Sequence, residues 1–269
     1  MSTQDFITEL FCRVDDIMHD VPKHPQAKVY PSEIVTLAMM FAVKGVGNRA
    51  FYRWVKRDFL HLFPLLPERT RLFRLFAAHK EWSERFLAEP TVLGVADSYG
   101  VELIHPIRQG RSDGQIGRKG YSNRRWIVGA KLCVLVNKWG LVVGWDSNGA
   151  NVKDTTFLPL IERYDGRMIV LTDNGFHVKS RDKGGPGDPA NMKVCNANTW
   201  NERMVIERVF GMFTTVCHTK KMSHRVWKYL NARFAYTIAA YNTIVQWGGL
   251  FPTPDEHGYV HLSIAPFAL

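Results

Sequence analysis

A short apolar run that ends at one acidic residue constrains the fold of this chain more than any other feature. Met168–Thr172 is rich in β-branched residues and stops abruptly at Asp173-Asn174-Gly175. A run of this length and composition is typical of a buried strand, and Asn-Gly marks a tight exit from it. The sequence therefore predicts a sheet with a carboxylate at its edge, although a lone strand ending in Asp usually signals only a turn.

The composition favours a folded protein with a polyanionic partner. Of the 269 residues, 46% are hydrophobic, which is enough for a full core and argues against disorder. Lys and Arg outnumber Asp and Glu by 35 to 25, giving a formal net charge of +10. This balance favours nucleic acid first and an anionic membrane surface second.

Cysteine spacing and hydropathy exclude several classes. The four cysteines stand far apart, so we expect buried free thiols and neither a zinc site nor a disulfide framework. The most apolar stretch, Ile34–Val43, is only ten residues long and too short for a membrane span. Met1–Asp5 lacks the basic segment of a secretory signal, which predicts a cytoplasmic protein.

Residues 1–89 are predicted to be helical. Apolar spacing predicts a first helix over Phe6–Met18, and Ser32 is the expected N-cap of a second, Glu33–Lys44. Two basic helices should follow: one over Arg49–Leu62, and a second that carries three arginines. These two are either a DNA-reading pair of the helix-turn-helix kind or ordinary solvated helices. The three arginines are Arg69, Arg71 and Arg74.

From Pro90 the pattern changes to strands. Thr91–Ala96 reads as a strand that ends on Asp97, and Tyr99–Ile104 continues it. A glycine-rich loop over residues 108–125 then carries six cations against one acid. Such a loop is suited to bind phosphates while it remains mobile; the alternative is a disordered surface loop. Its cations are Arg108, Arg111, Arg118, Lys119, Arg124 and Arg125.

A hairpin and a helix should come next. Trp126–Val136 and Leu141–Trp145 are predicted to pair, with Lys131 inside the first apolar strand. An unpaired ammonium there would be costly, so Lys131 either faces outward or meets an anion. Asp154–Tyr164 reads as a helix that Asp154 itself is expected to cap.

The rest of the chain is predicted to be mainly helical. A mobile loop is expected over Lys179–Pro189, followed by a short strand, Met192–Cys195. A long helical region should then run from Thr199 to Trp247 with a break near Ser223.

Three acids could meet in such a sheet. Asp97 and Asp173 end strands that could be neighbours at one edge, and Glu207 is the best third acid. At 100° per residue, Trp200, Arg203 and Glu207 share one face of their helix. Carboxylates suit Mg²⁺ or Mn²⁺, and two such ions roughly 3.5–4 Å apart can drive phosphodiester chemistry without a protein nucleophile.

At these residues the chain resembles the DDE transposases of bacterial insertion sequences, whose catalytic core is like ribonuclease H. The resemblance covers about Thr91–Trp247. Its motifs are VADSYG at Asp97, KGYSNRRWIVGAKLCVLVNKWGLVV, ANVKD at residues 150–154, LTDNGFH at Asp173 and WNERMVIERVFG at Glu207.

The helix of the third acid departs from the family pattern at two positions. The family's Tyr-x-x-Arg-x-x-x-Glu signature is matched by Trp200, Arg203 and Glu207, with Trp in place of Tyr. Seven positions later the family carries Lys, where this chain has Thr214. The role of that lysine, holding DNA near the cut, is expected to pass to Lys220 or Lys221.

The resemblance implies the following architecture and activity. An α/β, ribonuclease H-like mixed sheet flanked by helices should occupy residues 90–269, preceded by a small all-α DNA-binding domain at 1–89. Asp97, Asp173 and Glu207 should bind two Mg²⁺ or Mn²⁺ ions and catalyse cleavage and strand transfer at the ends of an insertion sequence. DNA contacts are expected from Arg203, Lys131, Lys119, Arg118, Arg124, Arg125, Lys220 and Lys221.

The resemblance also implies partners. They are double-stranded DNA, as terminal inverted repeats and target, and a second copy of the chain in a homodimer or higher oligomer, with the protein at the nucleoid. Two rival functions remain: a non-catalytic DNA-binding protein descended from a transposase, and a structure-specific nuclease on the same fold. His177, close behind Asp173, either touches the site or is a structural histidine.

Overall fold

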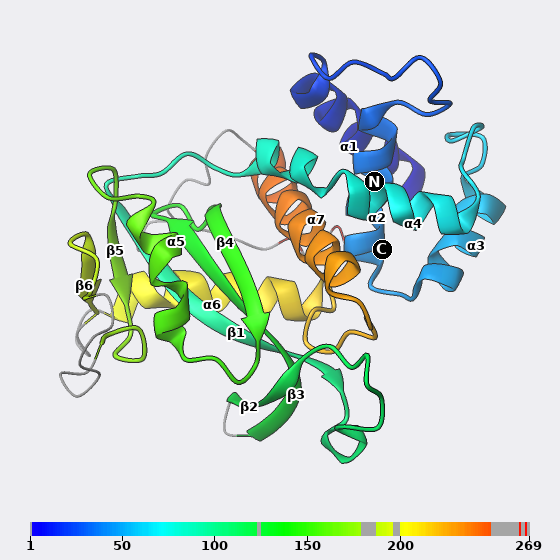
Figure 1. Ribbon diagram of the computed structural model, residues 1–269. Coiled ribbons are helices and arrows are strands. Elements are labelled where there is room, and N and C mark those ends of the chain that lie inside the picture. The colour runs from blue at the N-terminus through cyan, green and yellow to red at the C-terminus, as the bar shows by residue number, and fades with distance from the viewer. Residues whose placement is uncertain are drawn as a thin grey trace.

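The computed structural model describes residues 2–122, 125–178, 187–195 and 200–248, together with 264 and 267; for residues 200–203 it describes the backbone alone. Four helices gather at one end of the molecule, and a mixed sheet with flanking helices forms the other (Figure 1). The chain is thus a mixed α/β protein with its N-terminal part helical, as the sequence predicts.

The N-terminal helices follow the predicted pattern with one correction. The second helix begins at Pro31, and Tyr30 rather than Ser32 is its N-cap. The Glu33 carboxylate accepts the Tyr30 N–H at 2.7 Å, while Ser32 is buried. The elements are α1 (Thr3–Met18), α2 (Pro31–Lys44), α3 (Asn48–Asp58), α4 (Arg69–Ala78) and the 3-10 helix η1 (Lys80–Phe86).

Helices α3 and α4 carry their cations in solvent. Residues 59–68 separate the two helices, which is a longer connection than the short turn of a helix-turn-helix pair. Among the described residues no single helix is long and apolar enough to cross a membrane; α2 and α3 pass that test only as a pair bent by 116°.

One six-stranded mixed sheet forms the other part. β1 pairs antiparallel with β3 and parallel with β5, which pairs parallel with β6. β2 and β4 pair with successive stretches of the other edge of β3. The strands are β1 (Leu93–Ile104), β2 (Arg118–Ser122), β3 (Arg125–Asn137), β4 (Val142–Gly149), β5 (Ile169–Thr172) and β6 (Met192–Val194).

Two sequence predictions about the strands need correction. β1 runs without a break through Asp97, which therefore lies within the strand and not at its end. The basic segment 108–125 is not one loop, because it contains β2 and follows a 3-10 turn, η2 (Pro106–Arg108). Arg118, Lys119 and Arg125 are consequently held on a strand ladder.

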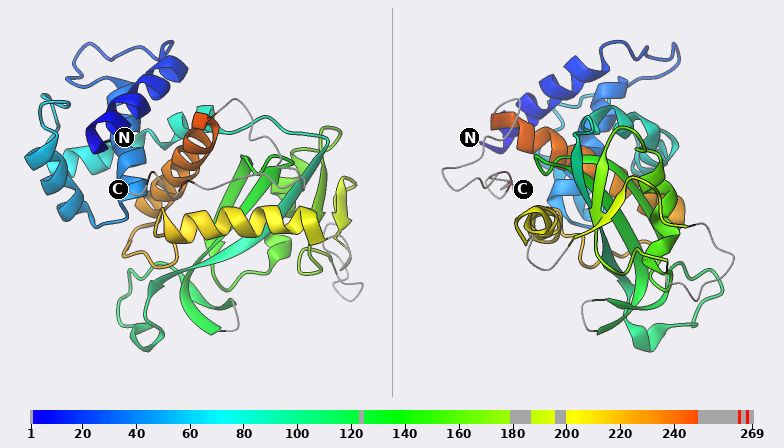
Figure 2. Two further views of the ribbon diagram at one scale, coloured as in Figure 1. Left: turned by 180° about the vertical axis from the view of Figure 1, so that it is seen from behind. Right: turned by 90° about the vertical axis from the view of Figure 1, so that its left-hand side faces the viewer.

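Helices cover both faces of the sheet (Figure 2). The 3-10 helix η3 (Asp154–Phe157) and the short α5 (Leu158–Glu162) pack with one face; together they end before Tyr164, where the predicted helix ended. On the other face lie α6 (Trp200–Thr215) and α7 (Trp227–Val245), separated near Ser223 as predicted. The core on this second face continues into the N-terminal helices.

Helix α7 is the element that the N-terminal helices and the sheet share. Tyr236 donates to the carbonyl of His79, and Asn242 donates to the carbonyls of Phe86 and Val142. Arg233, only 5% exposed, donates to the carbonyls of Phe41 and Ala42 in the last turn of α2 and to that of Cys217.

The end of α2 is fitted closely against this helix and the segment before it. Gly45 has a φ of +67°, and a Cβ added there would lie 2.0 Å from the His218 ring. Burial lowers the pKa of Arg233 to about 10, so the guanidinium remains charged at neutral pH. Cys133 and Cys217 are buried free thiols as predicted, whereas Cys12 is exposed.

We expect Arg233→Met to destabilise the protein by about 3 kcal/mol, because three buried carbonyls lose a charged donor. Urea denaturation of the full chain measures this loss. Arg85→Met, which breaks an exposed ion pair with Asp20, is the control and should leave the midpoint nearly unchanged. Equal midpoints for the two variants would contradict the role given to Arg233.

His224 should make stability depend on pH. Burial, and next the charge of Arg233, lower its pKa to about 4; the basic side chains of Lys221 and Arg225 line the same cavity. Because the unfolded chain takes up this proton near pH 6.5, the free energy of unfolding should fall between pH 6.5 and 4, by up to about 3 kcal/mol. His224→Gln should flatten this fall, whereas the exposed His61→Gln should retain it.

Candidate active site at the sheet edge

Asp97 and Asp173 occupy equivalent positions on neighbouring strands. In the parallel ladder Leu93 pairs with Ile169 and Val95 with Leu171. Asp97 and Asp173 each follow the last pair of this ladder by two residues, and Asp173 stands where the chain leaves β5. Both aspartates are half-buried. The pairing of β1 with β5 therefore brings together the two strands that lead to the predicted acids.

A third carboxylate, Asp154, joins them from the α5 side of the sheet. Its Oδ1 accepts from Ser98 Oγ at 2.6 Å and from Lys131 Nζ at 3.0 Å. A Cβ added to Gly175 would lie 3.0 Å from both Asp154 Oδ2 and Asp173 Oδ1. The two carboxylates thus converge on the space that a side chain at Gly175 would fill.

These contacts correct one prediction and answer a question that the sequence left open. Lys153, not Asp154, is the N-cap of η3, so the expected capping role of Asp154 is wrong. Lys131 meets an anion: its ammonium bonds to Asp154 and, at 2.9 Å, to the carbonyl of Val152, with 12% of the side chain exposed. A lysine inside an apolar strand was thus the sequence feature that pointed to a nearby anion.

The electrostatics of Cys133 reflect the same gathering of acids. Burial raises the pKa of this thiol well above its usual value, and the nearby charges of Asp97, Asp154 and Asp146 raise it further. Cys133 pairs with Ser98 on β1 and with Asp146 on β4. Negative charge is therefore concentrated around the middle of β3 at this end of the sheet.

Glu207 stands on α6, which packs against the opposite face of the sheet. Tyr99 of β1 stacks on Phe210 at 5.0 Å, and its hydroxyl lies 2.6 Å from Thr214 Oγ1. Residues 207, 210 and 214 share one helical face. The exposed Glu207 thus lies one turn before the Tyr99 contact.

The segment after α6 also contacts β1, since Lys221 forms a parallel bridge with Glu102. Asp97 lies two residues before Tyr99 on β1, so its side chain points to the same face of the sheet as Tyr99, the face that α6 covers.

Cations lie along β1 beyond the acids. Lys220 Nζ sits 4.8 Å from the Tyr99 ring, and partial burial, with the charge of Arg125, lowers the pKa of Lys220. Arg125 and Lys221 flank the Glu102 carboxylate at 3.2 and 3.8 Å. Thr214, where the resembled family has Lys, is thus a partner of Tyr99, and Lys220 and Lys221 follow it in the segment after α6.

The remaining predicted residues are placed as follows. Arg118 and Lys119 are exposed on β2, and the Lys119 ammonium lies 5.1 Å from the Trp126 ring. His177 bonds to Thr172 and Asp188 at 3.2 and 2.7 Å, which is a structural role. Arg124, the side chains of Trp200 and Arg203, and most of the predicted loop 179–189 lie outside the described residues.

The donor set fits a hard divalent cation with an open coordination shell. Within the described part of the chain, no three His, Cys, Asp or Glu side chains enclose a metal position. Mg²⁺, however, keeps several waters and is usually held by one or two carboxylates together with substrate phosphates. Asp154 and Asp173, whose carboxylates face each other across Gly175, and Asp97 on the neighbouring strand β1 are the residues that could supply those carboxylates.

Comparison of the sequence with protein-family models and with curated proteins found no match.

Gly175→Ala should weaken Mn²⁺ binding, by about tenfold, because its Cβ would push apart the carboxylates of Asp154 and Asp173. Isothermal titration calorimetry measures the affinity. Gly114→Ala is the matched control, since a Cβ there meets no atom within 4 Å. If both variants bind Mn²⁺ equally well, the carboxylates around Gly175 are not metal ligands.

Proposed function

We propose that this protein is a DNA transposase that uses bound divalent metal ions to cut DNA and join DNA strands at the ends of an insertion sequence. The observation that supports the proposal is the parallel pairing of β1 with β5, because Asp97 and Asp173 each follow the last paired residues by two positions, while Glu207 stands on the helix that packs against Tyr99 of β1. Carboxylates in this arrangement suit phosphodiester chemistry in which water attacks in cutting and a DNA 3′-hydroxyl attacks in joining.

The strand order supports a ribonuclease H-like core. Leaving aside β2, the sheet runs β4-β3-β1-β5-β6, with the first three strands antiparallel and the last two parallel to β1. Helices lie on both faces, with α6 across the face that carries Asp97 (Figure 2). The arrangement agrees with the fold that the sequence motifs imply.

The chain's own residues have distinct roles in this proposal. When bound, the metal ions would activate the attacking oxygen and stabilise the leaving one. Asp97 and Asp173 would hold them, and Glu207 would complete the shell of one ion. Ser98 and Lys131 fix one oxygen of Asp154, which leaves its other oxygen directed at Gly175 beside Asp173. Asp154 is therefore a positioning residue or a further ligand.

Charge supports DNA as the substrate. Lys220, Arg125 and Lys221 follow the acids along β1, and exposed cations cover α3 and α4. Such surfaces bind phosphate backbones without reading their sequence. The helical N-terminal part would recognise the ends of the element, and pairing of two ends would bring together at least two copies of the chain.

Asp97→Asn and Asp173→Asn should each lower cleavage by at least about a hundredfold, because the charge that holds the metal ions is lost. Asp154→Asn should cost roughly ten- to a hundredfold, as loss of a positioning group does. The assay uses the DNA that flanks the coding sequence, with Mg²⁺, and measures cutting and joining separately. Asp113→Asn, at an exposed position between η2 and β2, is the control.

The same experiment separates the rivals. Cleavage without joining would favour a nuclease on this fold. Absence of both activities together with absence of Mn²⁺ binding would favour a non-catalytic DNA-binding protein. Full activity of the Asp97 or Asp173 variant would refute the proposed site.

A further inference from the structure

A cavity at the junction of the N-terminal helices and the catalytic part has an unusual lining. Its volume is about 400 Å³, and it lies between the α2–α3 turn, residues 45–48, and the segment that joins α6 to α7. Five basic or histidine side chains line it, and the described lining contains no carboxylate. These five are His218, Lys221, His224, Arg225 and Arg233.

The start of α3 adds to this positive field. Gly47 is the N-cap, with extended backbone, and no side chain of the described residues caps the helix. The first N–H groups of a helix lack partners within the helix and carry partial positive charge. Gly47 and Asn48 line the cavity, so this helix end opens into it.

The walls of the cavity are fixed to both parts of the molecule. Arg233 ties α7 to the carbonyls of Phe41 and Ala42. On the other side, the N–H of Met222 donates to the Glu102 carbonyl at 2.9 Å, and that of Glu102 donates to Lys220 at 3.0 Å. The cations are thus held in a defined position relative to β1.

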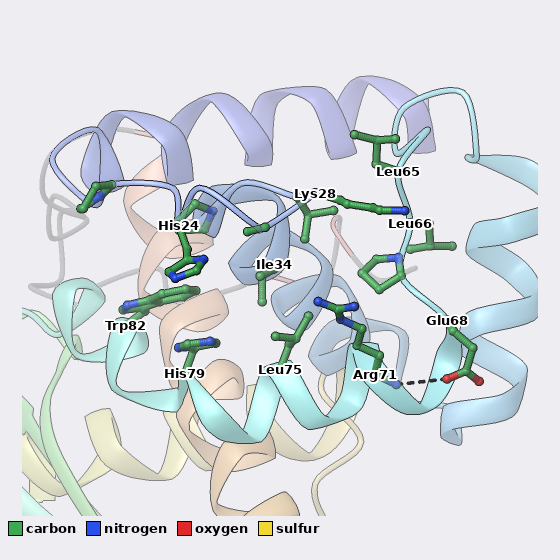
Figure 3. A pocket seen from close by; sticks show the side chains of 15 residues that line it. His24, Lys28, Ile34, Leu65, Leu66, Glu68, Arg71, Leu75, His79 and Trp82 are labelled. Atoms are coloured by element: carbon green, nitrogen blue, oxygen red, sulfur yellow. Dashed lines mark hydrogen bonds between the residues drawn. The ribbon is translucent and has the colours of Figure 1, made fainter.

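A second cavity has a lining of mixed charge, unlike that of the junction cavity. Figure 3 shows the cavity between the 22–31 segment and α4, about 330 Å³ in volume. Its cations, Lys28 and Arg71, share their lining with the Glu68 carboxylate and with many apolar side chains, among them Leu75 and Trp82. That cavity has mixed charge and gives no comparable preference for an anion.

We propose that the junction cavity binds a backbone phosphate of duplex DNA, at a point separated from the acidic edge by the length of β1 between Asp97 and Glu102. Five strand residues span about 17 Å, which is close to five base pairs of duplex. Lys220, above the Tyr99 ring, lies between the two points, and Arg125 lies beside Glu102. The inference rests on the proposed DNA substrate but not on cleavage.

Substitutions of two exposed cations test the inference by binding alone. Fluorescence anisotropy with a 20-base-pair duplex of arbitrary sequence, in EDTA, measures affinity over a series of salt concentrations. Lys221→Gln and Arg225→Gln should each weaken binding about five- to tenfold at 0.1 M salt and lower the log–log salt slope by about 0.9. The controls Lys228→Gln, just outside the cavity, and Arg163→Gln, beyond α5, should change neither quantity.

A pair of variants at Gly47 separates loss of the site from loss of the fold. A Cβ at Gly47 meets no atom within 4 Å, and its extended backbone suits an N-cap. Gly47→Asn and Gly47→Asp should both cap α3 and keep the melting temperature at or above that of the parent. Only Gly47→Asp places negative charge in the cavity, and it should weaken duplex binding at least tenfold relative to Gly47→Asn.

Each outcome has a distinct meaning. Equal duplex affinity for the two Gly47 variants, or equal losses for Arg225→Gln and Lys228→Gln, would overturn the cavity as a DNA phosphate site. The inference would also be overturned if calorimetry showed that inorganic phosphate binds in the cavity while the substitutions left the affinity for duplex DNA unchanged. If the substitutions weaken duplex binding as expected but the parent protein cleaves no DNA, the inference is upheld and the proposed transposase activity is refuted.

Discussion

The burial of helix α7 is the constraint on which the rest of the structure depends. Almost every residue from Leu230 to Ile244 is buried, so each polar group on it needs a partner inside the protein. Those partners are backbone carbonyls from α2, the 79–86 segment and the β3–β4 hairpin. The helix therefore holds the N-terminal helices and the sheet in one arrangement, with a single continuous core on that face of the sheet.

The sequence predicts much of this arrangement because local pattern determines most of its elements. Periodicity and helix breakers located α1, the end of α2 at Gly45 and the break between α6 and α7. The apolar run before Asp173 correctly predicted β5, and the spacing of strands around the hairpin agreed with a mixed sheet. The pairing of the two strands that lead to Asp97 and Asp173 agrees with the prediction that these strands are neighbours.

Other features depend on contacts that local pattern does not contain. β2 was hidden in a glycine-rich segment, and its one glycine, Gly120, is needed because the Ala150 backbone approaches so closely that an added Cβ would clash with the Ala150 carbonyl oxygen. Asp154 looked like a helix cap because its real partners, Ser98 and Lys131, are 56 and 23 residues away. Asp97 looked like a strand end because aspartate is uncommon inside strands. In the structure β1 continues through Asp97, which lies beyond the last residue of β1 that pairs with β5.

The placement of charge suggests how binding and chemistry could be divided on this surface. The acids that gather around Gly175 repel a phosphate backbone, and a strand of DNA could pass them closely only when cations offset that repulsion. Cations contact β1 further along its length. Lys220 lies over the Tyr99 ring, and Arg125 and Lys221 pair with the Glu102 carboxylate. On the proposed function, duplex binding would then depend on these side chains and not on metal, whereas close approach to the acids would require the metal ions. Because β1 carries Asp97 as well as Tyr99 and Glu102, which contact the cations, the length of this one strand would set the distance between the site of DNA binding and the site of DNA cleavage.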